Sequence, residues 1–334
     1  MSNYYDENRD TRNKILKRFS AFDGVGLDLR EVSSYDEALS SSGLDYTAEK
    51  RKMFLENGIE VPNAFACVKS DSDDVLGVVG NQYNPVSNRE AFSVAEEIVN
   101  NGWGNYEVGG PSYGSKNTVN FAKAFMVVRG DDFDIGEDTF NSFVVFNNSF
   151  DGSTGVSYKI ICQRVVCMNG MVRYLGGKKS QLQINIQHSR TAQDKIETAR
   201  LIMKQKLDEI EEIKREAEAF MGVGFSRQEF EKEIIPLILK EKRLVENEKE
   251  RERGAERVDA VVSQLIQAYN ADDVQNYANN AYRTILAISD FETHAAPLRD
   301  CGNSQYYLNN LTKGMVLTTA VAKYIAETRG VIVR

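Results

Sequence analysis

One stretch of the chain concentrates the side-chain types that bind nucleic acid. From Tyr158 to Gln193 there are six cationic residues and no aspartate or glutamate, although the whole chain has a net charge of −8. The cations are Lys159, Arg164, Arg173, Lys178, Lys179 and Arg190, and Tyr158, Tyr174 and His188 are interleaved with them. Cations neutralise phosphates and aromatic rings stack on bases, so this combination is typical of single-stranded nucleic-acid binding. A solvated basic surface, or a contact with the acidic part of another subunit, would have the same composition.

A second cluster could hold a metal ion. Five carboxylates crowd one short segment, namely Asp131, Asp132, Asp134, Glu137 and Asp138. Clustered carboxylates bind divalent cations in metal-dependent nucleases. The spacing misses the calcium-loop pattern, and no carboxylate–histidine cluster completes a two-metal site. We therefore expect a solvated hairpin loop and no metal.

The remaining reactive side chains do not form a recognisable catalytic set. Cys162 and Cys167 are five residues apart on a predicted strand, so they should point to opposite faces, and buried thiols are expected rather than zinc ligands. His188 and His294 have no serine or cysteine nucleophile in a recognisable motif beside them. We expect His188 to stack on a base or contact a phosphate, and His294 to be structural. We expect no catalytic residue and no cofactor.

Hydrophobic patterning predicts the elements that must position these side chains. Strands are expected at residues 63–69, 74–83, 118–129, 139–147, 155–169 and 181–187, and short helices at 11–19 and 47–56. Ser87 and Glu90 fit a capping box that begins another helix. The glycines at 102, 104, 109, 110 and 114 lack a phosphate-loop ending, so tight turns are expected there.

The second half of the chain changes character near Ser189. Apolar residues recur every three or four positions from Ile196 to Phe220, which predicts a long amphipathic helix ended by Gly222. Residues 227–257 carry nine basic and nine acidic residues, typical of a solvated helical hairpin. Further helices fit 258–270, 272–289 and 304–329. The predicted fold is α+β, with an antiparallel sheet, helices on one face and a C-terminal helical region.

Length and composition set the outer limits. The 334 residues are 42% hydrophobic and 27% charged, enough for a substantial core. We divide the chain into an N-terminal helical segment (1–60), an α+β sheet core (61–190) and a helical region (191–334). Its four cysteines are too few for a disulfide framework, and the first residues lack the apolar run of a secretory signal. We expect a cytoplasmic protein of a host cell.

Several stretches together resemble a known family. They are VGNQYNPVSNREAF (79–92), FDGSTG (150–155), QRVVCMNGMV (163–172), IQHSRTAQDKIETA (186–199) and NNAYRTILAISDFETHAAP (279–297). These are similar to the phage/plasmid-like proteins that carry domain of unknown function 932. The sequence departs from the family where Gln187, His188 and Ser189 replace its usual Arg-His-Thr. It also departs after the Arg-Val-Val-Cys run, where Met168, Asn169 and Gly170 stand in place of the usual Asn followed by Thr. The resemblance implies a mobile-element origin and a part in phage or plasmid DNA metabolism.

These observations lead to one expectation and one alternative. The order of four strands followed by a long helix is compatible with single-strand annealing proteins, an analogy at the level of fold. We expect a non-enzymatic, oligomeric phage or plasmid protein that binds single-stranded nucleic acid, DNA above all, for recombination or annealing. The alternative is a protein-interaction factor that modulates host defence or replication through the charged helical hairpin.

Overall fold

The computed structural model describes residues 22, 26–113, 119–164, 170–171, 183–242, 248–294 and 316–331. Its main sheet has the strand order β1-β5-β6-β8-β9-β10, with β7 paired to β8 and β11 paired to β9. All pairs in the sheet are antiparallel. The strands are β1 (Leu27–Asp28), β5 (Asn105–Tyr113), β6 (Val119–Arg129), β7 (Phe133–Ile135), β8 (Asp138–Ser149), β9 (Val156–Arg164), β10 (Gly170–Met171) and β11 (Gln183–Ile186).

The central strands are apolar on both faces, as their sequences predict for buried strands. On β8, Val144 and Phe146 face one way, whereas Phe143 and Val145 face the other. The first pair belongs to the large core beneath the helices. The second pair joins a smaller buried cluster on the opposite face, made of Phe22, Val108, Phe125, Val127, Phe143, Val145 and Ile161.

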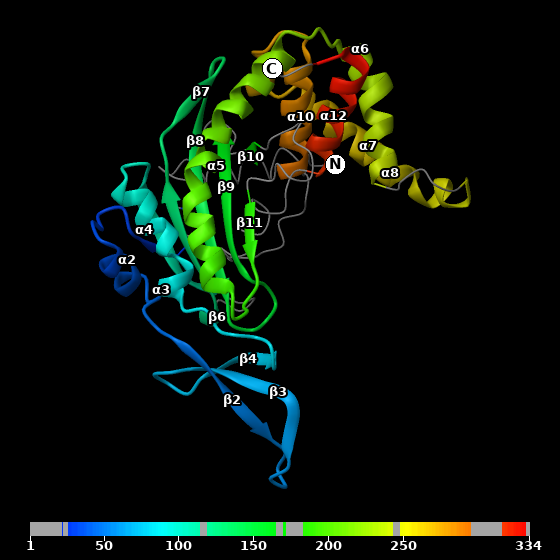
Figure 1. The fold of residues 1–334 in the computed structure, drawn as a ribbon. Helices are drawn as coiled ribbons and strands as arrows, with labels where there is room; N and C mark the ends of the chain where they lie inside the picture. The colour runs from blue at the N-terminus through cyan, green and yellow to red at the C-terminus, as the bar shows by residue number, and fades with distance from the viewer. Residues whose placement is uncertain are drawn as a thin grey trace.

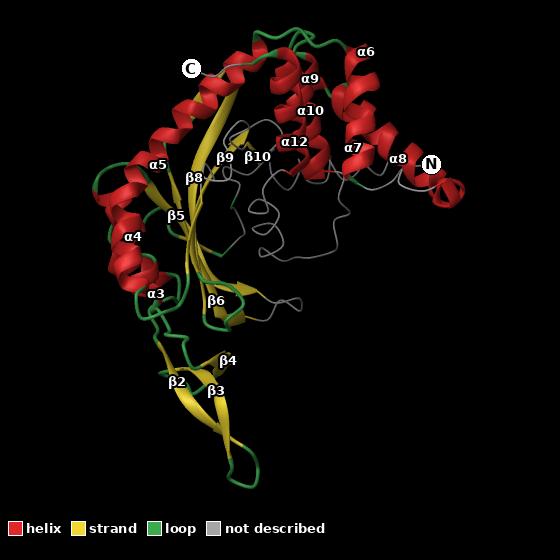
Figure 2. Cartoon of the chain, turned by 45° about the vertical axis from the view of Figure 1, so that its right-hand side comes forward, coloured by secondary structure: helices red, strands yellow, loops and turns green. Residues whose placement is uncertain are grey.

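Helices cover one face of the main sheet (Figures 1 and 2). They are α3 (Asn88–Ala91), α4 (Ser93–Asn100) and the long helix α5 (Ala192–Met221), with α2 (Tyr35–Ser41) beside them. Helix α5 buries Ile196, Ala199 and Met203, which confirms the predicted amphipathic stripe. The capping box is also confirmed: Ser87 Oγ accepts from the Glu90 backbone N–H, and Glu90 accepts from the Ser87 N–H.

The C-terminal helices pack together at one end of the sheet (Figure 1). They are α6 (Arg227–Glu229), a π-helical turn (Phe230–Ile234), α7 (Ile235–Glu241), α8 (Glu248–Tyr269), α9 (Asp272–Gln275), α10 (Ala281–His294) and α12 (Val316–Arg329). Pro236 lies in the first turn of α7, directly after the π-helical turn, and the backbone before it is already helical. The structure confirms the α+β class, with helices on one face and a helical region at the C-terminal end.

A second, three-stranded sheet lies at the opposite end of the molecule (Figures 1 and 2). It has the order β2-β3-β4, formed by β2 (Ala48–Phe54), β3 (Glu60–Lys69) and β4 (Val75–Gly80). We call residues 48–80 the arm. Strands β3 and β4 were predicted. The predicted helix at 47–56 was wrong, because Ala48–Phe54 pair with β3 and this tertiary pairing overrides the helix propensity of Glu and Lys.

The glycine-rich stretch also differs from expectation. Residues 105–113 form β5, an interior strand between β1 and β6, rather than a series of tight turns. A Cβ atom on Gly109 would lie 3.0 Å from the Leu29 side chain. Glycine there allows the N-terminal segment to lie close against the strand. The predicted helix at 11–19 falls outside the described residues.

Candidate functional site

The predicted nucleic-acid residues do not share one environment. Lys159 lies on β9, on the face opposite α5, and is half-buried, and burial lowers the pKa of its ammonium group. Arg190 is exposed just before α5 begins. Arg173, Tyr174, Lys178 and Lys179 lie outside the described residues.

The strands around the basic stretch nevertheless fix where it begins and returns. Strand β10 pairs with β9 through Gly170 and Met171. Strand β11 pairs with β9 through Gln183 to Ile186. In the sequence, Arg173, Lys178 and Lys179 stand between these two strands, both of which pair with β9.

Arg164 is a correction to the predicted set, because its side chain is only 1% exposed. Its Nη1 lies 2.8 Å from Asp273 Oδ2, and its Nη2 donates to Asp138 Oδ1 at 2.7 Å and to the Asp273 carbonyl at 2.7 Å. Tyr277 donates its hydroxyl to Asp138 Oδ2 at 2.5 Å. We call these four residues the Arg164 cluster. A buried guanidinium paired with two buried carboxylates is not available to a phosphate.

The same cluster corrects part of the acidic-loop prediction. Asp138 is 5% exposed and was expected to be solvated. Asp131, Asp132, Asp134 and Glu137 are exposed, as expected. The difference follows from the pleat, because Asp138 points to the face where Arg164 of β9 lies. Within the described part of the chain, no group of three or more His, Cys, Asp or Glu side chains is placed to hold a metal ion.

His188 is a second correction, because it stacks inside the protein rather than on a base. The ring is 6% exposed and lies 4.7 Å from the Tyr83 ring. Its Nδ1 accepts a hydrogen bond from the Val86 N–H at 3.2 Å. Burial lowers the pKa of His188 to about 4. The imidazole is therefore neutral near pH 7, with no positive charge to offer a phosphate. Cys162 is a buried thiol, as expected.

Around His188, three of the stretches that carry the family resemblance meet. Asn148 on β8 donates to the Val86 carbonyl and to Asn88 Oδ1, both at 3.0 Å, and Asn88 donates to the Leu44 carbonyl at 3.1 Å. A Cβ atom on Gly155 would lie 2.2 Å from the Ile186 carbonyl. Buried hydrogen bonds and close backbone approach of this kind fix the ends of strands. We call this region the motif junction.

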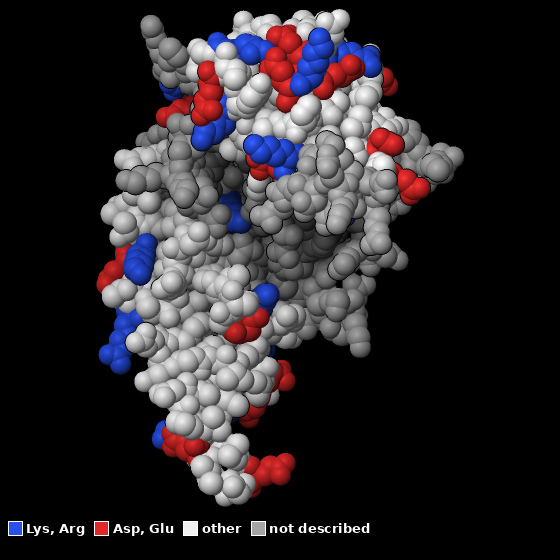
Figure 3. Space-filling model, turned by 90° about the vertical axis from the view of Figure 1, so that its right-hand side faces the viewer, with Lys and Arg blue, Asp and Glu red and all other residues white. Residues whose placement is uncertain are grey.

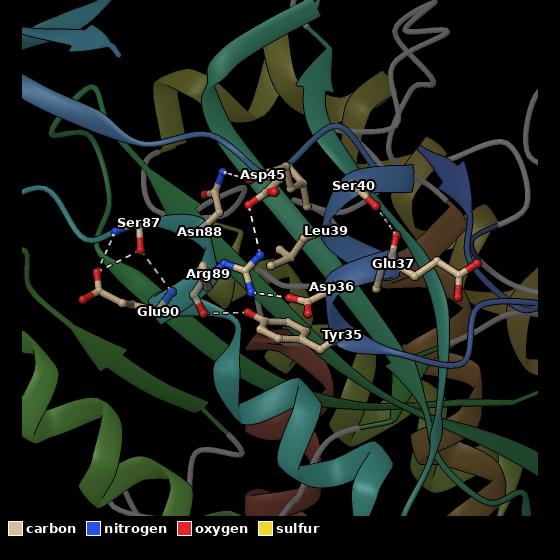
Figure 4. A network of polar contacts seen from close by, with 12 residues as sticks. Tyr35, Asp36, Glu37, Leu39, Ser40, Asp45, Ser87, Asn88, Arg89 and Glu90 are labelled. Carbon is tan, nitrogen blue, oxygen red and sulfur yellow. Dashed lines mark hydrogen bonds and ion pairs between the residues drawn. The ribbon is translucent and has the colours of Figure 1, made fainter. Parts of the chain in front are cut away.

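Beside the motif junction, a polar pocket of about 430 Å³ lies between α2, α3, α4 and α5. Tyr35 donates its hydroxyl to the Arg89 carbonyl at 2.6 Å, and Arg89 forms ion pairs with Asp36 and Asp45 (Figure 4). Four carboxylates and two guanidinium groups line the pocket: Asp36, Glu90, Glu96, Glu197, Arg89 and Arg200. The excess of negative charge suits a cationic group and disfavours phosphate.

The sequence-based prediction missed this pocket. The capping box already placed Arg89 and Glu90 in the first turn of a helix. The helical spacing of the apolar residues in α5 also indicated that Gln193, Glu197 and Arg200 border the buried side of this helix. What the sequence did not signal was helix α2, which closes the pocket with Tyr35 and Asp36.

Comparison with known proteins gives one match. The family model described as Domain of unknown function (DUF932) matches residues 75–312. No curated protein and no solved structure matches the chain. Among the described helices, none combines the length and apolar character needed to cross a membrane.

Proposed function

This chain belongs to the DUF932 family, and we propose that it is a phage or plasmid protein that binds single-stranded nucleic acid. In this proposal it acts as a non-enzymatic oligomer in DNA recombination or annealing. Annealing requires an extended strand, neutralised phosphates and exposed base edges, and it requires no bond to be broken. Such a protein therefore needs a nucleic-acid-binding surface and no catalytic centre.

The observation that supports the proposal most is the charge of the stretch attached to β9. Residues 158–190 carry six cations and no carboxylate in a chain of net charge −8. Five of the six remain candidates for phosphate contact once Arg164 is assigned to its buried cluster. Strands β10 and β11, which flank Arg173, Lys178 and Lys179 in the sequence, both pair with β9. Local positive charge acts over about 8 Å at physiological salt, so the overall negative charge does not cancel it.

The arrangement of elements is a second support. An antiparallel sheet backed by a long helix agrees with the fold-level analogy to single-strand annealing proteins. Figure 3 shows acidic and basic side chains mixed together on the helical end and on the arm.

The test compares two pairs of lysines in one binding assay. Lys178→Ala with Lys179→Ala should weaken binding to single-stranded DNA of every sequence. It should also flatten the slope of log affinity against log salt by roughly 1 to 1.5, since each phosphate contact contributes about 0.7. Lys232→Ala with Lys323→Ala is the control, because both lysines are exposed and lie outside the stretch 158–190 and outside the arm. Tyr174→Ala should cost about 1–3 kcal/mol with little change in slope if its ring stacks on a base.

Two outcomes would contradict the proposal. One is wild-type affinity and slope in the folded Lys178/Lys179 variant. The other is equal weakening by the control pair, which would show only a general effect of net charge.

A second candidate function is a protein-interaction factor that modulates host defence or replication. The exposed apolar side chains of the arm favour protein contact. Absence of any DNA binding at low salt, together with a stable complex with a host protein, would make this the better account.

A further inference from the structure

The arm carries most of the large apolar side chains that the described chain exposes to solvent. Five of the eight belong to it: Phe54, Leu55, Ile59, Val75 and Val78. The arm extends away from the main sheet, at the end opposite the helical region (Figures 1 and 2). Scattered apolar residues on a surface are ordinary, whereas a concentration on one projecting element marks a contact surface.

The end of the arm is an ordered turn with its apolar side chains outward. The Leu55 N–H donates to the Ile59 carbonyl at 2.8 Å, and the Gly58 N–H donates to the Leu55 carbonyl at 2.8 Å. Phe54, Leu55 and Ile59 are 58%, 54% and 58% exposed. We call these three residues the tip. Its backbone is already fixed by hydrogen bonds, so docking would lose little further conformational entropy.

The charges of the arm indicate what kind of molecule could cover the tip. Residues 48–80 contain six carboxylates and four cations. Each cation is engaged within the protein: Lys50 with the Asn81 carbonyl, Arg51 with Glu49 and Asp73, Lys52 with Glu60, and Lys69 with Asp71. A surface with a negative balance and no spare cation repels nucleic acid and anionic lipid headgroups. The chemistry therefore favours a protein.

We propose that the tip is a homotypic contact, in which the arm of one copy packs against the arm of a second copy. A two-fold interface brings one patch against itself, so the patch must be self-complementary. The tip meets this condition with three apolar side chains at its centre. At its border, Lys52 is 61% exposed, and Glu56 makes no ion pair with any residue that the structure describes. In a two-fold pair, the exposed Lys52 of each copy can exchange its ion pair with Glu60 of its own chain for one with Glu56 of the other copy.

This contact supplies the oligomer invoked by the proposed function, and in that respect it rests on that proposal. The contact itself needs no nucleic acid. It lies at the opposite end of the molecule from the helical region, so pairing of arms covers neither α5 nor the C-terminal helices.

The first test measures the mass of the full chain by light scattering at micromolar concentration. The wild type should be a dimer or a larger assembly with an even number of copies. Phe54→Ser, Leu55→Ser and Ile59→Ser together should shift the mass to half or less, with an unchanged circular dichroism spectrum. The control is Leu201→Ser, which removes an 80% exposed side chain from α5 and should leave the mass unchanged. A monomeric wild type, or an assembly that survives the tip variant, overturns the inference.

The second test distinguishes tip-to-tip pairing from docking of the tip on another surface. Lys52→Glu alone and Glu56→Lys alone should each weaken self-association, because like charges then face each other across the two-fold axis. Mixing the two variants should restore association, since the new carboxylate of one variant then lies opposite the new ammonium group of the other. If mixing does not restore it, tip-to-tip pairing is wrong.

Binding of a short single-stranded oligonucleotide by the tip variant separates this inference from the proposed function. If the tip variant no longer assembles but still binds the oligonucleotide, both the tip contact and the proposed function are supported. Tip-dependent assembly without binding in any variant leaves the contact standing and removes the proposed function.

Discussion

The Arg164 cluster and the arm use the same residue types in opposite ways. In the cluster, Arg164 is 1% exposed and is held by two buried carboxylates that come from β8 and α9. In the arm, Arg51 also contacts two carboxylates, but 44% of its side chain is exposed, and the apolar residues beside it face solvent. Buried charge joins the sheet to the helical end, whereas the arm has surface charge and exposed apolar groups. The cluster holds two parts of the chain together, whereas the arm has the exposed apolar surface that we propose as a contact with a second copy.

The largest expected effect comes from removing the buried cation. Arg164→Ala leaves Asp138 and Asp273 buried without a counter-charge, which should destabilise the fold by about 3–5 kcal/mol. Arg51→Ala is the matched control and should cost less than about 1 kcal/mol, because exposed ion pairs contribute little. Denaturant unfolding followed by circular dichroism measures both. Similar losses in the two variants would show that burial does not distinguish these regions.

An effect of intermediate size should appear when the pH is lowered. Burial holds the pKa of His188 near 4, below its ordinary value of 6.5. Above pH 6.5 the ring is neutral in both the folded and unfolded states. As the pH falls from 6.5 towards 4, only the unfolded state takes up the proton, so stability should fall by about 3 kcal/mol over that window.

The variant His188→Asn isolates this contribution. Its stability should change less than that of the wild type between pH 6.5 and 4, although it can start lower at pH 7. Equal pH dependence of the two proteins, measured by denaturant midpoints, would mean that His188 titrates normally in the folded state.

The smallest effect is expected in the exposed part of the acidic hairpin. Asp131→Asn, Asp132→Asn and Asp134→Asn together should change stability by about 1 kcal/mol or less, because these side chains are exposed. Nucleic-acid binding should stay unchanged. Loss of an activity that added magnesium restores would reveal a metal site in this hairpin.

Most of the sheet and the long helix could be predicted because their signals are local. Strands β6, β8, β9 and β11 follow from β-branched and aromatic runs, and α5 follows from apolar residues at helical spacing. The capping box at Ser87 was predicted to the residue. Strand β2 was missed because its composition suits a helix, and only pairing with β3 makes it a strand. The division of the chain into three domains stays a prediction.

The candidate site could be predicted less well, because residue type does not determine burial. Arg164 and Lys159 are both cations on β9, yet the pleat turns Arg164 towards Asp138 and Asp273 and leaves Lys159 half-buried on the other face. His188 does stack on an aromatic ring, but the ring is that of Tyr83, more than 100 residues away in the sequence, and not a base. The tertiary fold brings these side-chain partners together, and no local sequence pattern predicts them.

The most direct test of the central claim is a salt titration of the wild-type protein binding to a single-stranded oligonucleotide. With Arg164 excluded, at most five cations of the stretch 158–190 contact phosphates. Each contact contributes about −0.7 to the slope of log affinity against log salt, so two to five contacts give a slope between about −1.4 and −3.5. Binding that weakens along such a slope, at every sequence tried, is the predicted result. No binding at low salt, or an affinity that does not change with salt, would contradict a phosphate-binding surface on this protein.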